Sequence, residues 1–478
     1  MKTSTKKRLI KFSLILGILM VILGLVAWYK FFREEPEQTF DDANEQFKYG
    51  SVGGEADAGI PYWIWLVLPR IFPEHMPRAG GYKAFGLVWE EGQELPVGFT
   101  KRTIGFPRVG NNCALCHVGT YRSKLDETPT VVIGAPGHSF RVQEMLRFLV
   151  AAANDPRFTA STLLEEIQKE TELSYLDKVL YRFVIIPRTK AALIEQGKKL
   201  DWMNDNPEWG PGRDDAFNLP KYALANMTVD GSAGACDFNS VWNMKARTGS
   251  NKYLNWCGES PSLRSVVIDS ALGVGAQPDS EFSDHAKRIE DFMNNLAPPP
   301  YPFEINQPLA TRGGALYSEH CARCHEPGQA LTNTVISLDE IQTDPERERA
   351  WSQFAADTFN EVVDDMGFKG REPVIKQTGY LSSPLDGIWM RAPYLHNGSV
   401  PNLRELLKIP ENRVSKFYRG FDVYDSQDVG FVCKGPDAKR EGWLHDTKTR
   451  GDGNQGHSYG SELSEDQKSA LIEFLKTL

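Results

Sequence analysis

Two short cysteine–histidine motifs constrain this chain more than any other feature of its sequence. They are Cys113-Ala-Leu-Cys116-His117 and Cys321-Ala-Arg-Cys324-His325. Two thiols three residues apart share one side of a helical turn, and the histidine that follows shares it as well. This arrangement lets the thiols form thioethers with the two vinyl groups of a haem, while the histidine reaches the iron. With only 7 cysteines and 9 histidines in 478 residues, chance would give roughly 0.002 such motifs.

A zinc site or a disulfide is the alternative interpretation of each cysteine pair. Zinc needs four ligands, and an oxidising compartment disfavours clusters of free thiolates. We therefore predict two covalently bound haem c groups, with His117 and His325 as the proximal iron ligands. Cys236, Cys257 and Cys433 remain. A Cys236–Cys257 disulfide would close a loop of about 20 residues and contribute about 3 kcal/mol in the chain-entropy model, and the sequence leaves its existence open.

The N-terminus predicts a membrane helix. Residues 1–33 hold seven basic residues and no acidic one, and the eighteen residues from Phe12 to Tyr29 carry no charge. That length is close to the minimum for crossing a bilayer, and the basic cluster Lys6-Lys7-Arg8 favours a cytoplasmic N-terminus. No small-residue cleavage site follows, so an uncleaved anchor is favoured over a cleaved signal. The body would then lie in the periplasm of a bacterium, held by a single pass through the inner membrane.

The charge of the chain excludes one class of partner and suggests another. The formal net charge is −9 although the N-terminal segment is basic, so the body is strongly acidic. A protein that binds nucleic acid by neutralising phosphates would not have this balance. An acidic body instead suits a small redox protein with a basic face as the electron donor.

The rest of the chain predicts a mainly helical protein with two cytochrome c-like haem domains and long loops. The proline-rich stretch Leu296-Ala-Pro-Pro-Pro-Tyr-Pro302 places the boundary, because proline continues neither a helix nor a central strand. The predicted units are 1–33 for the membrane helix, 34–300 for the first haem domain and 301–478 for the second. No strong strand alternation is evident, and no repeat beyond the two haem motifs.

Three local patterns support this helical organisation. The apolar run Tyr62–Leu68 is too short to span a bilayer, and a buried core segment is favoured over membrane contact or a channel lining. Thr343-Asp-Pro345 predicts the start of one helix over 346–363. Ser464 and Gln467 form a capping box that predicts the last helix.

Two further histidines are candidates for the sixth iron ligand. His396 lies in Tyr394-Leu-His-Asn-Gly398, and His457 lies in Gly456-His-Ser-Tyr-Gly460. Glycine beside histidine lets the backbone approach a flat cofactor closely. The alternative for each is a loop histidine that bonds the backbone or a haem propionate. Met390 is the one methionine nearby, and packing is the favoured role for it.

These motifs resemble the bacterial di-haem cytochrome c peroxidase superfamily, and within it the rubber-oxygenase-like branch. The resemblance covers roughly residues 100–478. It rests on both haem motifs, Leu385–Pro401, Thr343-Asp-Pro345, Trp209-Gly-Pro-Gly-Arg213 and Gly456–Gly460. The family fold is two helical cytochrome c-like domains. The resemblance implies an active site at the N-terminal haem and an electron-transfer haem in the C-terminal domain.

The resemblance also assigns individual residues. Trp256 stands where the family has a tryptophan between the haems, so it is a candidate relay, with a buried packing role as the alternative. Val266 and Ala276 stand where peroxidases have a distal glutamine and glutamate that cleave peroxide. The first haem would then use Glu281, a shifted residue or an apolar pocket instead of that polar pair. Pro410 stands where peroxidases have a methionine ligand, so His457 is preferred for the second haem, with His396 in reserve. Arg391 replaces a calcium-binding threonine. Arg391 is a candidate for binding the cofactor, and its presence at this position makes an inter-domain calcium doubtful.

The sequence thus predicts a membrane-anchored periplasmic di-haem oxidoreductase. His117 would hold an iron that activates hydrogen peroxide or dioxygen, and electrons would pass through the second haem and Trp256. Peroxidase chemistry is favoured over rubber cleavage, because an anchored enzyme has poor access to an insoluble extracellular polymer. A cytochrome that only transfers electrons, with both irons six-coordinate, is the alternative from a different class.

Overall fold

The computed structural model describes residues 2–31 and 33–478, and 43% of the chain is helical. This agrees with the prediction of a mainly helical chain with long loops. The helices are α1 (Lys2–Phe31), α2 (Ala43–Tyr49), α3 (Tyr62–Ile71), α4 (Val142–Asn154), α5 (Ala160–Ile167), α6 (Tyr175–Leu180), α7 (Ile186–Lys199), α8 (Met244–Arg247), α9 (Leu263–Gly273), α10 (Phe282–Asn295), α11 (Gln307–His320), α12 (Ala322–His325), α13 (Leu338–Ile341), α14 (Glu346–Ala350), α15 (Gln353–Met366), α16 (Leu403–Leu406), α17 (Pro436–Glu441) and α18 (Glu465–Leu475).

The strands are short and form small antiparallel sheets, which the sequence did not predict. The longest pair is β2 with β3, where Gly105 makes the connection with φ +71. Their bounds are β1 (Ile60–Pro61), β2 (Phe99–Ile104), β3 (Phe106–Asn111), β4 (Val118–Tyr121), β5 (Thr130–Ile133), β6 (Arg213–Asp214), β7 (Cys236–Asp237), β8 (Val335–Ile336), β9 (Tyr380–Leu381), β10 (Lys416–Arg419), β11 (Tyr424–Asp425), β12 (Gly430–Phe431) and β13 (Trp443–Asp446).

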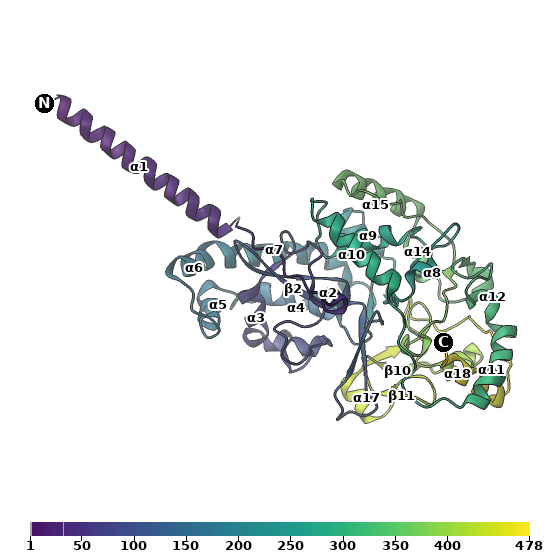
Figure 1. Ribbon diagram of the computed structural model, residues 1–478. Coiled ribbons are helices and arrows are strands. Elements are labelled where there is room, and N and C mark those ends of the chain that lie inside the picture. Colours follow the sequence, from purple (N-terminus) through teal and green to yellow (C-terminus); the bar gives the residue numbers. More distant parts are fainter. Residues whose placement is uncertain (1, 32) are drawn as a thin grey trace.

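Helix α1 projects away from the body of the molecule (Figure 1). Its apolar stretch Ile10–Lys30 is exposed over nearly its whole described length, and Lys30 at its end contacts the body. By length and composition this stretch can cross a membrane, and a signal sequence would have the same properties. Residues 1 and 32 of the predicted membrane segment lie outside the described residues.

The apolar run that begins at Tyr62 forms helix α3 and lies in the core, as predicted. Ile64 and Leu68 are fully buried, and they belong to one apolar cluster with Phe85 and Phe148. Burying side chains of this size stabilises the fold by roughly 1.5–3 kcal/mol each. The cluster forms a base beneath the β2–β3 pair that leads to the first haem motif.

The other two large clusters join residues from both sides of the predicted boundary at residue 300. Val267 of α9 packs in one cluster with Val363 of α15. Trp242 packs in another with Trp389 and Leu471. The segment between α10 and α11 is irregular, as the prolines predict, but the two halves of the chain share their cores.

The helix predicted over 346–363 is two helices. Helix α14 ends at Ala350, and Ser352 begins α15 by accepting a hydrogen bond from the N–H of Ala355 at 3.0 Å. Trp351 between them is buried with an extended backbone. The serine cap therefore starts a new helix after one buried extended residue. The capping box at Ser464 is confirmed.

The structure also reveals a second repeat that the sequence analysis missed. Residues 254–260 and 394–400 are loops of the same form, each closed by a bridge between its first and last residues. In each loop the second residue and the fifth, a glycine, have positive φ: Asn255 and Gly258 in one, Leu395 and Gly398 in the other. Each loop is followed by a proline, a side-chain cap and a Leu-Arg pair that opens a helix. In this repeat Trp256 corresponds to His396.

Candidate haem sites

The first motif lies on a tight turn after strand β3. The side chain of Asn112 accepts a hydrogen bond from the N–H of Ala114 at 2.9 Å, which starts the turn over Cys113–Leu115. The Nδ1 atom of His117 donates to the carbonyl oxygen of Asn239 at 2.8 Å. That bond fixes the ring orientation and leaves Nε2 as the atom able to bind a metal. Phe238 contacts the ring edge-to-face at 6.5 Å between centroids.

The second motif begins where α11 ends. Cys321 terminates α11, and α12 carries Cys324 and His325. Here too Nδ1 of the histidine donates to a backbone carbonyl, that of Ser383, at 2.6 Å. The histidines of the two motifs therefore have the same tautomer and the same kind of support, although their partners lie in unrelated segments.

A second histidine ring faces His325 but not His117. The ring centroids of His325 and His457 are 6.2 Å apart. Two imidazoles that share one metal, each bonded at about 2 Å, would have centroids about 6 Å apart, because the ring centre lies about 1 Å behind the nitrogen. For His117, the only ring contact recorded among the described residues is with Phe238.

His457 is held in place through its backbone. Gly456 and His457 both have positive φ, +73° and +46°, which turns the loop sharply. The N–H of His457 donates to the carbonyl of Ile341 at 2.8 Å. The Arg413 guanidinium donates to the carbonyl of Gly456 at 2.8 Å and to that of His457 at 2.9 Å. An αL residue other than glycine is strained, and these bonds hold it there.

The protonation states of these groups suit metal ligation. Burial lowers the pKa of His457 to about 3, with the charges of His325 and Arg413 acting in the same direction. Burial also lowers the pKa of His117 and of His325. The imidazoles are therefore neutral at pH 7, as metal ligands must be. The pKa of Cys113 rises to about 11 and that of Cys321 to about 12, chiefly through burial, so these are thiols and not thiolates.

The zinc alternative finds no support in the described part of the chain. There, the one cluster of three potential metal-binding side chains is Glu74, His75 and Asp155. It contains none of the motif residues, and Arg157 already pairs with Asp155 at 2.8 Å. Cys236, Cys257 and Cys433 are free thiols in the structure, so the Cys236–Cys257 disulfide is not formed.

Arg391 lies where an anionic cofactor group would be balanced. Arg391 and Arg247 share the single carboxylate of Asp386, each at 3.0 Å. The Nε atoms of both arginines are buried without a hydrogen-bond partner. Burial, with Arg247 next in effect, lowers the pKa of Arg391 to about 10, and the charge of Arg391 in turn lowers the pKa of His325. The surplus buried positive charge at this arginine pair, and the orphaned N–H group of Arg391 near His325, fit a propionate of a haem.

A cavity of 250 Å³ opens beside Cys113. Helices α2 and α10 flank it, and its apolar walls include Phe47, Ile289 and Phe292. Arg288 is the basic residue in its lining. The cavity therefore gives small molecules a route to the place where the first thioether would form.

Glu281 is not among the residues that line this cavity, and its expected role at the first iron stays a prediction. It is 52% exposed, and its carboxylate binds Arg102 at 3.0 Å. Glu281 precedes α10, whereas the cavity is lined by residues about two turns further along that helix. Of the residues at the peroxidase positions, Val266 packs against an apolar cluster and Ala276 is fully buried.

Trp256 and His396 meet at Asp237. The indole Nε1 of Trp256 donates to the carbonyl of Asp237 at 2.6 Å, and the N–H of Asp237 donates to the carbonyl of His396 at 2.9 Å. The ring of His396 stacks on Tyr380 with centroids 3.9 Å apart, and its Nε2 has no partner. Burial places the pKa of His396 well below its usual value. The two repeated loops are thus joined through one backbone unit.

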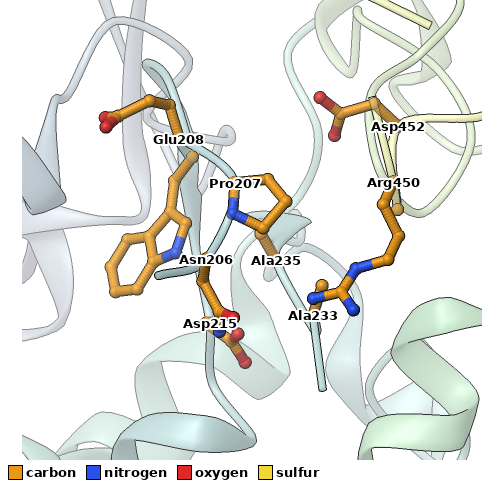
Figure 2. Close-up of a pocket in the computed structure, with 10 residues that line it drawn as sticks. Asn206, Pro207, Glu208, Asp215, Ala233, Ala235, Arg450 and Asp452 are labelled. Atoms are coloured by element: carbon orange, nitrogen blue, oxygen red, sulfur yellow. The ribbon is translucent and has the colours of Figure 1, made fainter. Parts of the chain in front are cut away.

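Buried charges surround this junction. The carboxylate of Asp237 binds Arg419 at 2.6 Å, and the fully buried Arg213 binds Asp452. Beside Asp452 lies a cavity of 10 Å³, with Arg450 and Asp452 on one side and Pro207 on the other (Figure 2). That volume holds about one water molecule. It is too small for a substrate, so the network serves to hold the loops together.

Several residues of the sites carried no signal in the sequence. Asn239 and Ser383 act through backbone carbonyls, which any residue type supplies. Arg413 is an isolated arginine far from both motifs. The loop repeat was detectable, because Gly258-Glu-Ser-Pro-Ser-Leu-Arg264 and Gly398-Ser-Val-Pro-Asn-Leu-Arg404 share four of seven residues in register.

Comparison with known proteins identifies one part of this arrangement. Residues 379–419 match a family model described as RoxA-like, cytochrome c-like. The match contains Ser383, Arg391 and the His396 loop, and it ends before His457. The chain therefore carries a RoxA-like cytochrome c domain, which implies haem c and suggests a haem-based oxidoreductase.

Two curated proteins of Sinorhizobium fredii (strain NBRC 101917 / NGR234) are similar to the chain. The uncharacterized protein y4iM is 30% identical over 288 residues, which are 50% of this chain and 64% of y4iM. The chain thus spans just under two thirds of the length of that relative. The uncharacterized protein y4iJ is 24% identical over 575 residues, 92% of each chain. The second similarity runs through both halves of the molecule.

Proposed function

We propose that the protein is a di-haem c oxidoreductase in which the first haem is the reaction site and the second transfers electrons. The observation that carries this proposal is the asymmetry of the two proximal histidines. Both donate Nδ1 to a backbone carbonyl, but among the described residues a second histidine ring lies opposite His325 and none lies opposite His117. A haem with an open axial position activates peroxide or dioxygen, and one with two histidine ligands exchanges electrons.

The residues have separate tasks in this proposal. Cys113 and Cys116 attach one haem, Cys321 and Cys324 the other, and His117, His325 and His457 bind the irons. Arg391 balances a propionate. The cavity beside Cys113 admits the oxidant, and its phenylalanines keep the site largely dry. Trp256, fixed by its bond to Asp237, lies at the junction of the two repeated loops and is the relay candidate.

Helix α1 would hold this enzyme in the bacterial inner membrane with its body in the periplasm. The oxidising compartment suits covalent haem attachment, and a small redox protein with a basic face would supply electrons to the acidic body. Hydrogen peroxide is the preferred oxidant. The similarity of residues 379–419 to a RoxA-like family supports a second candidate, a rubber-oxygenase-like reaction with dioxygen at the same site.

The test is optical spectroscopy of the purified haem-loaded protein with each oxidant. We expect hydrogen peroxide to change the spectrum of one haem in the oxidised protein within seconds, and a reductant to restore it. For the dioxygen candidate, the reduced protein would instead form a stable adduct with dioxygen at one haem. Failure of both oxidants to change either haem would leave the protein as an electron-transfer cytochrome.

A further inference from the structure

One face of the body combines exposed aromatic side chains with basic ones next to helix α1. It lies on the continuous helical segment formed by α6, a π-helical turn over Tyr181–Ile185 and α7. Tyr175 is 85% exposed and Phe183 is 70% exposed. We call the exposed side of this segment the 175–199 face.

The other side of the segment is firmly buried. Tyr181, Ile185 and Ile186 belong to the same apolar cluster as α3. The segment is therefore packed on one side and presents a fixed set of residues on the other. Helical segments that lie in a membrane–water interface typically carry both aromatic and basic side chains, as the exposed side of this segment does.

The charge of the face is opposite to that of the body. Residues 175–199 hold six basic and two acidic residues, whereas the whole chain has a net charge of −9. Arg182, Arg188, Lys198 and Lys199 are exposed. A basic patch attracts anionic surfaces, and the surface nearest α1 is that of the membrane that this helix can enter.

The position of α1 brings the face to that membrane. The Nζ atom of Lys30, at the end of the apolar stretch Ile10–Lys30, binds the carboxylate of Asp177 in α6 at 2.6 Å. Figure 1 shows α1 leaving the body beside α6 and α7. Where the apolar helix ends, the headgroup layer begins, so α6 starts at headgroup level when α1 lies in a bilayer.

We propose that the 175–199 face binds the anionic surface of the membrane that α1 crosses. Tyr175 and Phe183 enter the headgroup layer, and Arg182, Arg188, Lys198 and Lys199 contact lipid phosphates. The contact fixes the orientation of the body on the bilayer, which a single helix alone would leave free. The proposal is independent of the haem chemistry and requires only that α1 lies in the membrane.

The test is hydroxyl-radical footprinting of the full chain in lipid nanodiscs, read by mass spectrometry at single residues. Phe354 in α15 is the internal control, because it is also 70% exposed, and Figure 1 shows α15 well away from α1. In discs that contain phosphatidylglycerol we expect Phe183 to be oxidised several-fold more slowly than Phe354. Equal oxidation of the two phenylalanines in these discs would overturn the proposal.

A charge variant tests the role of lipid phosphate. Arg182→Gln with Arg188→Gln should return the oxidation of Phe183 to the level of Phe354. The matched control, Lys439→Gln with Arg440→Gln on α17, removes the same charge elsewhere and should leave Phe183 protected. Protection of Phe183 that is equal in phosphatidylcholine discs and unchanged by the arginine variant would contradict binding to anionic headgroups.

Discussion

His457 faces His325 because a strained turn is held by three backbone hydrogen bonds, from its own N–H and from Arg413. We predict that His457→Ala converts the second haem from low to high spin, since the opposite ring is removed. The absorption spectrum of the oxidised protein measures this. His396→Ala is the control and should leave both haems unchanged, because its ring stacks on Tyr380. An unchanged spectrum in the His457 variant would rule it out as a ligand.

Asp386 carries a pH-dependent part of the stability. Burial raises its pKa, but Arg391 and Arg247 together lower it further, so the pKa in the folded state is below the usual value. Its contribution is complete above about pH 4 and is lost as the pH falls through the folded-state pKa. Asp386→Asn should lower the free energy of unfolding at pH 7 by about 2 kcal/mol, less than for a fully buried pair, because the carboxylate is 18% exposed.

Denaturant unfolding of the parent protein and of the Asp386→Asn variant measures this difference in stability. The range from about pH 3 to about pH 8 covers the usual pKa of an aspartate, about 4. The two stabilities should differ by a constant amount at neutral pH and converge in acid. A difference that grew as the pH fell would show that the aspartate has the opposite effect.

At the scale of elements, α2 and α10 control access to the first motif. We predict that Ile289→Trp fills part of the cavity beside Cys113 and slows the binding of cyanide to the oxidised protein several-fold. Stopped-flow absorbance measures the rate. Ile409→Trp, at a site that is 44% exposed and outside the cavity lining, should leave the rate unchanged. Equal rates in both variants would show that the ligand enters elsewhere.

The elements that sequence could predict were those with local causes. The capping box at Ser464, the prolines at 296–302 and the apolar run at Tyr62 each act within a few residues. The break at Trp351 depends on the burial of that residue against distant segments, whereas the loop repeat was visible in the sequence and only its junction at Asp237 needed the structure. The ion pair of Glu281 with Arg102 was not predictable either, because Arg102 lies on a hairpin that the sequence did not reveal.

At the scale of the whole molecule, the motifs predicted the cofactor chemistry but not how the halves of the chain pack. Trp242 and Val267 belong to apolar clusters that extend beyond residue 300, and no pattern along the chain encodes such pairings. The acidic charge is likewise a property of the sequence, whereas the basic 175–199 face exists only once α6 and α7 are folded beside α1.

The anchor gives a prediction for the intact protein. We expect full-length chain to sediment with membranes and to resist extraction by high salt, because its attachment is apolar. Intact mass spectrometry should give the whole chain, with its N-terminal segment, plus two haem groups. A product that begins after residue 27 and remains in the soluble fraction would show that the segment is a cleaved signal.

The central claim is that the two sites differ, one closed by His457 and one open at His117. Electron paramagnetic resonance of the oxidised, haem-loaded protein tests it most directly. We predict one high-spin and one low-spin ferric signal of equal intensity, with the high-spin signal alone altered by hydrogen peroxide. Two low-spin signals that hydrogen peroxide leaves unchanged would show that the site at His117 is not open.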